Sequence, residues 1–259
     1  MLGQGALHEP SPQHNGAALP LPFRPTSGPP RRLGAGMEIA FVLDFLRRLA
    51  ANNNTAWMQD HRADYLRARD AFAGLVAEVL HRATPALPEL AGLTPTQTMF
   101  RLHKNDRSQR DPEPYKRRLG AGLVPGGRHA LRAGYFVALM PGGGSWLRAG
   151  RFSPTPAELA AIRQEIHYDS TGFHRIIADK DLLQHFPTGL DRSVEQLSRP
   201  PRGYAADDPD LPYLKLKSFG VVRLFSDEEV GAPDFLDRLV AGIVAARPWV
   251  EYLNQALLA

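Results

Sequence analysis

The spacing of hydrophobic residues changes twice along this chain, and this change constrains the fold more than any single motif. Toward both ends, apolar residues recur every three or four positions, as on one face of a helix. In the middle, aromatic and β-branched residues form short runs bounded by Pro and Gly, which is typical of strands. Parallel βαβ units would need a helix between every strand pair, and these helices are missing. The sequence therefore predicts an α+β fold, with a mainly antiparallel twisted sheet in the middle of the chain packed by N- and C-terminal helices.

The same periodicity gives the expected bounds of each element. Helices are expected at residues 38–50, 56–82, 156–168 and 232–258, the last interrupted at Pro248. Strands are expected at residues 96–103, 118–124, 133–140, 145–152 and 214–225. The run from Asn52 to Thr55 ends the first helix and caps the second, and the run from Pro141 to Gly144 turns the chain between two strands. The pattern over residues 170–192 is mixed and assigns no element.

Residues 1–36 differ in composition from the rest of the chain. They hold seven of the 23 prolines and six glycines but only one acidic residue. A segment of this kind buries too little apolar surface to offset the entropy lost on ordering, so we expect a disordered tail. Met37 opens the first periodic segment, and residues 37–259 are expected to form a single globular domain.

Several functional classes are excluded by what the sequence lacks. The chain has no cysteine, which rules out disulfide scaffolds, thiolate zinc sites, iron–sulfur clusters and cysteine nucleophiles. A reducing, cytoplasmic location fits this composition. No apolar run approaches the ~20 residues of a membrane span, so no membrane association is expected. The histidines form no ligand-spaced pair, and no Gly-x-Ser-x-Gly or phosphate-loop motif is present, so neither a metal nor a cofactor is expected.

Positive charge is concentrated in one segment. The whole chain carries +4, whereas residues 101–132 contain nine Lys and Arg against three acids, and residues 224–259 contain six acids against two bases. A concentrated positive field attracts phosphates, nucleic acid or small anions. The alternative is that these side chains pair with acids elsewhere in the fold. Outside residues 1–36 the net charge is only about +2, which is below the strongly basic footprint of most nucleic-acid-binding domains.

Two polar segments are candidates for a ligand site. The first contributes Arg101, Arg107, Tyr115 and Lys116, because Arg and Lys bind carboxylate or phosphate and Tyr adds a hydroxyl or a stacking face. The alternative is a solvated loop between strands with structural ion pairs. The second segment contributes the residues Arg202, Tyr204 and Lys217, after two stiffening prolines and beside Gly203.

The acids of the second segment, Asp207 and Asp208, allow two interpretations. They can cap the short helix that Pro209 would start, which is the interpretation we favour, or act as an acid–base pair or metal ligands. Near the N-terminus, Trp57 and Tyr65 form a stripe typical of a helix buried in a core, and Asn53 and Asn54 are expected to be caps.

Taken in order, these segments resemble a known family over residues 38–258. The motifs that carry the resemblance are Asn53-Asn54 before Trp57, Arg62 and Tyr65; Phe100-Arg101, Arg107 and Pro114-Tyr115-Lys116; Gly134-Tyr135 and Pro141-Gly142; Pro156, Leu159, Ile162 and Arg163; Pro201-Arg202-Gly203-Tyr204, Pro209 and Leu216-Lys217-Ser218-Phe219; and Leu253-Asn254. The chain is similar to the conserved hypothetical family called domain of unknown function 2461. No activity is established for this family, so the resemblance implies a fold and a set of positions rather than a reaction.

The chain departs from the family pattern at seven positions: Ser108-Gln109-Arg110 replace Phe-Ser-Lys, and four further residues differ singly. Asn105 replaces an acid, Ala138 and Met140 replace a His and an acid on the Gly-Tyr strand, and Asp208 replaces a His before the proline. The matching residues are mostly cationic and aromatic. We therefore expect binding of a phosphate-bearing or other anionic ligand, nucleic acid included, at a basic site. The alternatives are an enzyme acting on an anionic substrate, and a structural or interaction module without a small-molecule ligand.

Overall fold

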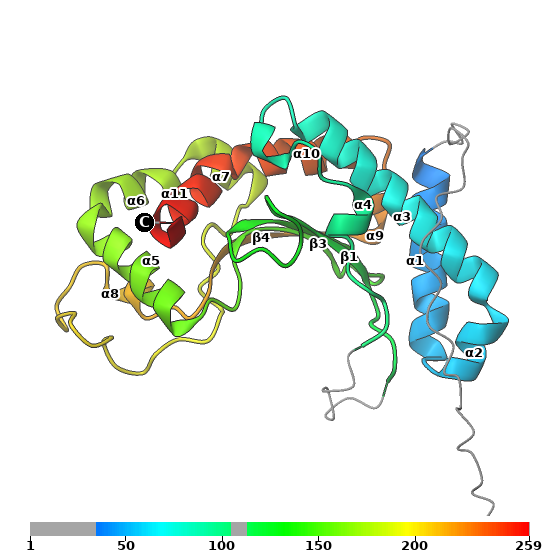
Figure 1. Ribbon diagram of the computed structural model, residues 1–259, viewed down its shortest axis with the longest axis horizontal. Helices are drawn as coiled ribbons and strands as arrows, with labels where there is room; N and C mark the ends of the chain where they lie inside the picture. Colours follow the sequence, from blue (N-terminus) through cyan, green and yellow to red (C-terminus); the bar gives the residue numbers. More distant parts are fainter. Residues whose placement is uncertain (1–34, 105–112, 259) are drawn as a thin grey trace, which may run out of the picture. The chain divides into compact units, whose positions relative to one another are not determined.

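The computed structural model describes residues 35–104 and 113–258, and its architecture is α+β, as the sequence predicts (Figure 1). Helices precede and follow a four-stranded antiparallel sheet whose strand order is β1-β2-β3-β4. The expected disordered tail lies outside the described residues, except that the first helix already begins at Ala35. Within the described part of the chain, no helix is both long enough and apolar enough to cross a membrane.

The helices before the sheet are α1 (Ala35–Ala51), α2 (Thr55–Asp60), α3 (Arg62–Ala83), the 3-10 turn η1 (Pro88–Leu90) and α4 (Pro95–Thr98). As expected, Asn54 caps α2 by accepting a hydrogen bond from the Trp57 backbone N–H at 2.9 Å. The single helix expected at 56–82 is wrong, because the chain leaves helical geometry at His61. There the imidazole Nδ1 lies 2.9 Å from the Trp57 carbonyl oxygen and the ring stacks on the Trp57 indole, which competes with the regular helix.

The sheet consists of β1 (Leu119–Leu123), β2 (Gly134–Leu139), β3 (Ser145–Arg151) and β4 (Phe219–Phe225). The strand expected at 96–103 does not form. Pro95 stands in the first turn of α4, and a capping box between Thr94 and Gln97 stabilises that turn. The chain after α4 then forms isolated antiparallel bridges, from Met99 to Ala121 of β1 and from His103 to Tyr115, which precedes β1.

The remaining helices are α5 (Pro156–Tyr168), α6 (Ser170–Ile177), α7 (Lys180–His185), α8 (Leu211–Leu214), α9 (Asp227–Gly231), α10 (Phe235–Ala245) and α11 (Arg247–Leu258). Helix α5 has the predicted bounds. Strand β4 begins five residues later than expected, because α8 occupies the start of the predicted strand. The last helix is interrupted at Ala246 rather than at Pro248, which lies in the first turn of α11, where the missing N–H of proline breaks no helical bond.

The two faces of the sheet differ. The register places Leu147 and Ala149 on the first face, where α10 and α11 pack against β3 and α3 and α4 pack against β1. Trp249 of α11 is fully buried in this core. Alternate residues form the second face, and Figure 1 shows no helix directly against it. The second face is defined by the residues Gly120, Gly122, Phe136, Ala138, Trp146, Arg148, Val222 and Leu224.

Candidate functional site

Three residues of the first predicted cluster lie together at the outer edge of β1. The Lys116 backbone N–H donates to the Leu102 carbonyl at 2.9 Å, and Lys116 Nζ donates to the Arg101 carbonyl at 2.8 Å. Tyr115, the residue before Lys116, forms an antiparallel bridge with His103. Arg107, the fourth member of the predicted cluster, lies outside the described residues. The structure therefore brings Arg101, Tyr115 and Lys116 to one edge of the sheet.

The backbone of Tyr115 is held by a side chain from the other end of the fold. Asn53 Nδ2 donates to the Tyr115 carbonyl at 2.9 Å, and Asn53 Oδ1 accepts from the Tyr115 N–H at 3.1 Å. The Asn53 side chain thus forms the same two hydrogen bonds with the Tyr115 backbone that a neighbouring strand would form. The expectation that Asn53 caps a helix is therefore wrong. The Tyr115 ring meets the His103 ring edge-on, with centroids 5.4 Å apart. Tyr115 is a positioned, partly buried side chain.

Some of the concentrated positive charge is neutralised within its own segment. Lys104 lies 3.8 Å from the Glu113 carboxylate, and Arg117 forms an ion pair with the same carboxylate. Arg128 donates instead to the backbone carbonyls of Thr96 and Gln97. Side-chain pairing therefore explains part of the charge, as the alternative interpretation held. By contrast, Arg101 and Arg118 form no ion pair with any described residue.

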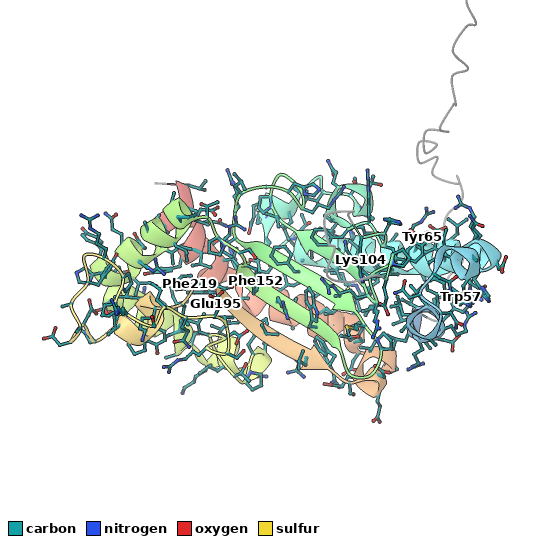
Figure 2. The ribbon with its side chains drawn as sticks, turned by 90° about the horizontal axis from the view of Figure 1, so that it is seen from below. Trp57, Tyr65, Lys104, Phe152, Glu195 and Phe219 are labelled. Carbon is teal, nitrogen blue, oxygen red and sulfur yellow. The ribbon has the colours of Figure 1, made fainter. Side chains whose placement is uncertain are left out.

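The second predicted cluster divides between two places. Arg202 and Tyr204 line a cavity of about 470 Å³ beside α5, whose side of the cavity includes Arg163 and His167. Burial raises the pKa of Tyr204; Arg163 opposes this increase and Asp208 adds to it. Lys217 does not line this cavity. It forms an ion pair with Glu195 instead. Figure 2 labels Glu195, the partner of Lys217.

Two His–Asp pairs connect this loop to α5 and α6. His167 Nδ1 lies 3.1 Å from Asp208 Oδ2, and His174 Nε2 lies 2.6 Å from Asp210 Oδ1. The carboxylates are buried, with side-chain exposures of 6% for Asp208 and 3% for Asp210, whereas the imidazoles are exposed. Asp208 also accepts the Asp210 backbone N–H at 2.8 Å, just before α8 begins. The favoured prediction that Asp207 or Asp208 caps a helix begun by Pro209 is therefore wrong, because the N-cap of α8 is Asp210. Asp208 instead stabilises the turn before α8 through the Asp210 N–H.

A group that the sequence analysis did not single out lies on the second face. Trp146 and Arg148 alternate along β3 with the core residues Leu147 and Ala149. The Arg148 guanidinium carbon lies 4.5 Å from the centroid of the Trp146 ring and 5.7 Å from that of Phe152, which Figure 2 labels. The sequence signal that could have identified this group is the alternation of Trp146 and Arg148 with apolar residues in the predicted strand at 145–152. It places a Trp and an Arg together on the face opposite the core.

Arg148 is distinguished by the absence of a counter-ion. Among the described residues it makes no hydrogen bond and no ion pair, and its Nε is buried without a partner. Burial lowers the pKa of Arg148, Arg118 lowers it further, and Asp191 partly offsets these effects. Other arginines of the sheet are paired: Arg151 lies 2.9 Å from Glu158 and Arg223 lies 3.2 Å from Glu229. The fold therefore holds a partly buried cation that has no counter-ion among the described residues.

The positive field of Arg148 extends along the second face toward β1. Arg118 lies in a bend directly before Leu119, the first residue of β1. Burial lowers the pKa of Lys116, and Arg118 lowers it further, as Arg118 does for Arg148. Arg118 is therefore within electrostatic range of both Lys116 and Arg148.

Comparison with known families agrees with the resemblance drawn from the motifs. A family model described as conserved hypothetical protein (DUF2461) matches residues 41–252, which is most of the chain. The chain belongs to this family. No curated protein and no solved structure matches it.

One departure from the DUF2461 pattern lies in the candidate site. Ala138, which stands where the family pattern often has a His, pairs with Trp146 and with Gly120 on the second face. Met140, which stands at an acidic position of the pattern, follows directly after β2. In this DUF2461 protein, Ala138 therefore leaves the position paired with Trp146 without a group capable of acid–base chemistry.

Proposed function

We propose that this DUF2461 protein binds a phosphate-bearing or other anionic ligand on the second face of the sheet. The observation that carries the proposal is the partly buried guanidinium of Arg148, which has no counter-ion among the described residues. A bound anion would supply that counter-ion. The proposal places the ligand between Arg148 on β3 and the cations beside β1.

The energetics of Arg148 favour this role over a purely structural one. A buried donor without a partner costs about 1–3 kcal/mol, and a charged donor costs more. An arginine kept only for packing would be paired, as Arg151 is with Glu158 at side-chain exposures of 14% each. A ligand phosphate or carboxylate offers two acceptor oxygens in the geometry that a guanidinium fork matches. Hydrogen bonds to charged groups contribute about 1.5–3 kcal/mol each.

The residues expected from the sequence take unequal parts in this proposal. Lys116 and Arg101 lie at the edge of β1 next to Arg118, so they extend the site toward solvent. Tyr115 is fixed by Asn53 and forms the rim of this edge. Arg202 and Tyr204 line the separate cavity beside α5, and Lys217 is neutralised by Glu195. The proposal therefore rests on the first predicted cluster and on Arg148.

The direct test measures the affinity of the full chain for inorganic tripolyphosphate by calorimetry. We expect Arg148→Gln to weaken binding by about tenfold or more, because it removes at least one charged hydrogen bond and tenfold corresponds to about 1.4 kcal/mol. Lys116→Gln is expected to weaken binding less, because Lys is a point charge at the rim.

The matched control is Arg175→Gln, which removes the same charge from a residue of α6 that lines a different cavity. We expect it to change the affinity by less than twofold. Equal effects of Arg148→Gln and Arg175→Gln would show that binding follows net charge rather than this site, and would contradict the proposal. A protein that binds no anion at all would support the interaction-module alternative.

A second candidate function is catalysis at the cavity beside α5, and one observation favours it. Buried Asp208 holds Nδ1 of His167, which directs the other ring nitrogen away from the carboxylate, as in acid–base dyads. Tyr204 meets the same imidazole edge-on at 5.5 Å, and Arg202 and Arg163 would hold an anionic substrate. The test is a panel of phosphate and carboxylate esters. Turnover that His167→Gln abolishes and His174→Gln leaves intact is the expected result, and turnover unaffected by His167→Gln would end this candidate.

A further inference from the structure

Aromatic rings surround Arg148 on the second face and give the proposed anion site a second kind of contact. The guanidinium lies near both the Trp146 ring and the Phe152 ring. The Phe136 and Phe152 rings meet edge-on, with centroids 5.6 Å apart. All three rings are partly exposed. Leu224, which pairs with Trp146 across β3 and β4, is 62% exposed and continues the apolar surface.

Glycines in the neighbouring strands allow these rings to lie against the backbone. A Cβ added to Gly122 would come within 3.1 Å of the Phe136 ring, and one added to Gly220 would come within 2.3 Å of the Phe152 ring. Side chains at these two positions would push the rings off the sheet. The glycines therefore produce a low platform of aromatic faces and edges instead of an ordinary surface of protruding side chains.

We infer that this platform binds single-stranded nucleic acid, with bases on Trp146 and its aromatic neighbours and phosphates on Arg148, Arg118 and Lys116. The inference rests on the proposed anion site and names its ligand class. Four-stranded antiparallel sheets that carry aromatic rings on one face can stack two or three unpaired bases. Neighbouring strands lie about 4.8 Å apart, so four strands span a width of about 14 Å, enough for such a short stretch.

Charge complementarity selects a single strand over other occupants of the face. Arg148 lies beside the Trp146 and Phe152 rings, and the charge of Arg118 acts on both Arg148 and Lys116, so rings and cations occur in one part of the sheet, as a phosphate backbone running beside its own bases requires. A duplex hides the flat faces of its bases and would leave Trp146 without a partner. Free phosphate would use Arg148 but not the rings. The combination of rings and cations therefore indicates a ligand that carries both bases and phosphates.

The experiment compares two labelled oligomers of about eight nucleotides, one with bases and one in which every base is absent but the sugar–phosphate backbone is complete. Binding of each to the full chain is followed by fluorescence anisotropy. We expect the oligomer with bases to bind at least tenfold more tightly. With three phosphate contacts, a plot of log affinity against log salt concentration should have a slope of about −2.

Variants then assign the two contributions. Trp146→Ala should remove the preference for the oligomer with bases while leaving the affinity for the base-free oligomer within about twofold. Trp146→Phe keeps an aromatic face and should retain most of the preference, which separates lost stacking from lost structure. Arg148→Gln should weaken both oligomers and reduce the salt slope by about 0.7.

The outcomes distinguish this inference from the proposed function on which it rests. Equal binding of the two oligomers by the unaltered protein would overturn the inference and leave the anion site standing. Tighter binding of a duplex of the same sequence would also overturn it. Failure to bind either oligomer while tripolyphosphate binds would reject nucleic acid alone. Failure to bind any of these ligands would reject the inference and the proposed function together.

Discussion

Arg148 and Arg151 are two arginines of one strand that lie in different surroundings. Both belong to β3 and both are partly buried. Arg151 is paired with Glu158 through three hydrogen bonds of 2.9–3.1 Å, so its charge stabilises the junction of β3 and α5. Arg148 lies beside the Trp146 and Phe152 rings and forms no ion pair with any described residue. Residues kept at a cost to stability are commonly found at functional sites.

This contrast predicts opposite changes in stability. We expect Arg148→Met to raise the free energy of unfolding of the ligand-free protein by about 0.5–2 kcal/mol, because it replaces an uncompensated cation by an apolar chain of similar length. Arg151→Met is expected to lower it by about 3 kcal/mol, because it leaves the Glu158 carboxylate unpaired. Urea denaturation of the three proteins measures both changes. Destabilisation by Arg148→Met would show that Arg148 has a structural role.

At the scale of elements, Asp227 joins three segments that are distant in sequence. Its carboxylate accepts the backbone N–H groups of Gly142 and Gly143 at 3.0 Å each and lies 2.7 Å from Arg47 of α1. Consecutive backbone N–H groups in such a turn form an anion-binding nest. The turn at Pro141–Gly144 thus binds the protein's own carboxylate through two backbone N–H groups.

The pH dependence of stability tests this junction. Burial raises the pKa of Asp227, but the Gly142 and Gly143 N–H groups and Arg47 outweigh burial and lower the pKa overall. A carboxyl whose pKa is lower in the folded state stabilises the fold above its unfolded pKa of about 3.9, and this contribution disappears as the pH falls through the folded pKa. We expect Asp227→Asn to destabilise the protein at pH 7 by about 1–2 kcal/mol.

The same comparison at acidic pH completes the test. As the pH falls through the folded pKa of Asp227, the difference in unfolding free energy between the unaltered protein and Asp227→Asn should shrink toward zero. Asp237→Asn is the control, because Asp237 pairs with Arg82 at a side-chain exposure of 69% and should have little effect at either pH. A destabilisation by Asp227→Asn that is constant with pH would contradict the role of the charge.

The sequence predicted correctly those helices and strands whose capping residues, prolines and apolar spacing all lie within the element itself. The Thr155 cap, Pro156 and three apolar residues at helical spacing define α5 to the residue. The break at His61 and the turn of α4 depend on side-chain contacts that periodicity does not contain. The candidate site was predicted in part. Charge density and motif order indicated Arg101, Tyr115 and Lys116, whereas the unpaired state of Arg148 follows from strand register and from the places of all nearby acids, which are properties of the folded chain.

At the scale of the whole fold, the hydrophobic core lies on the first face of the sheet and the proposed binding site on the second. Its first face is buried under α3, α4, α10 and α11, and the core there contains the largest buried side chains, Trp249 and Tyr135 among them. Its second face carries the rings of Phe136 and Trp146 and the cation Arg148 beside the aliphatic side chains of Val222 and Leu224. Acids of the C-terminal part are engaged by arginines, as Glu229 is by Arg223 and Arg238. The modest net charge is therefore compatible with a local cationic face.

The measurement that tests the central claim most directly is a heteronuclear NMR titration that observes the Arg148 Nε–H group while inorganic tripolyphosphate is added. Because this Nε is buried and has no hydrogen-bond partner among the described residues, a bound anion must change its surroundings. The account predicts saturable shifts of the Arg148 Nε–H and the Trp146 indole N–H, with Arg163 unchanged. Shifts confined to residues of the cavity beside α5, or no shift at Arg148 while the anion binds, would contradict it.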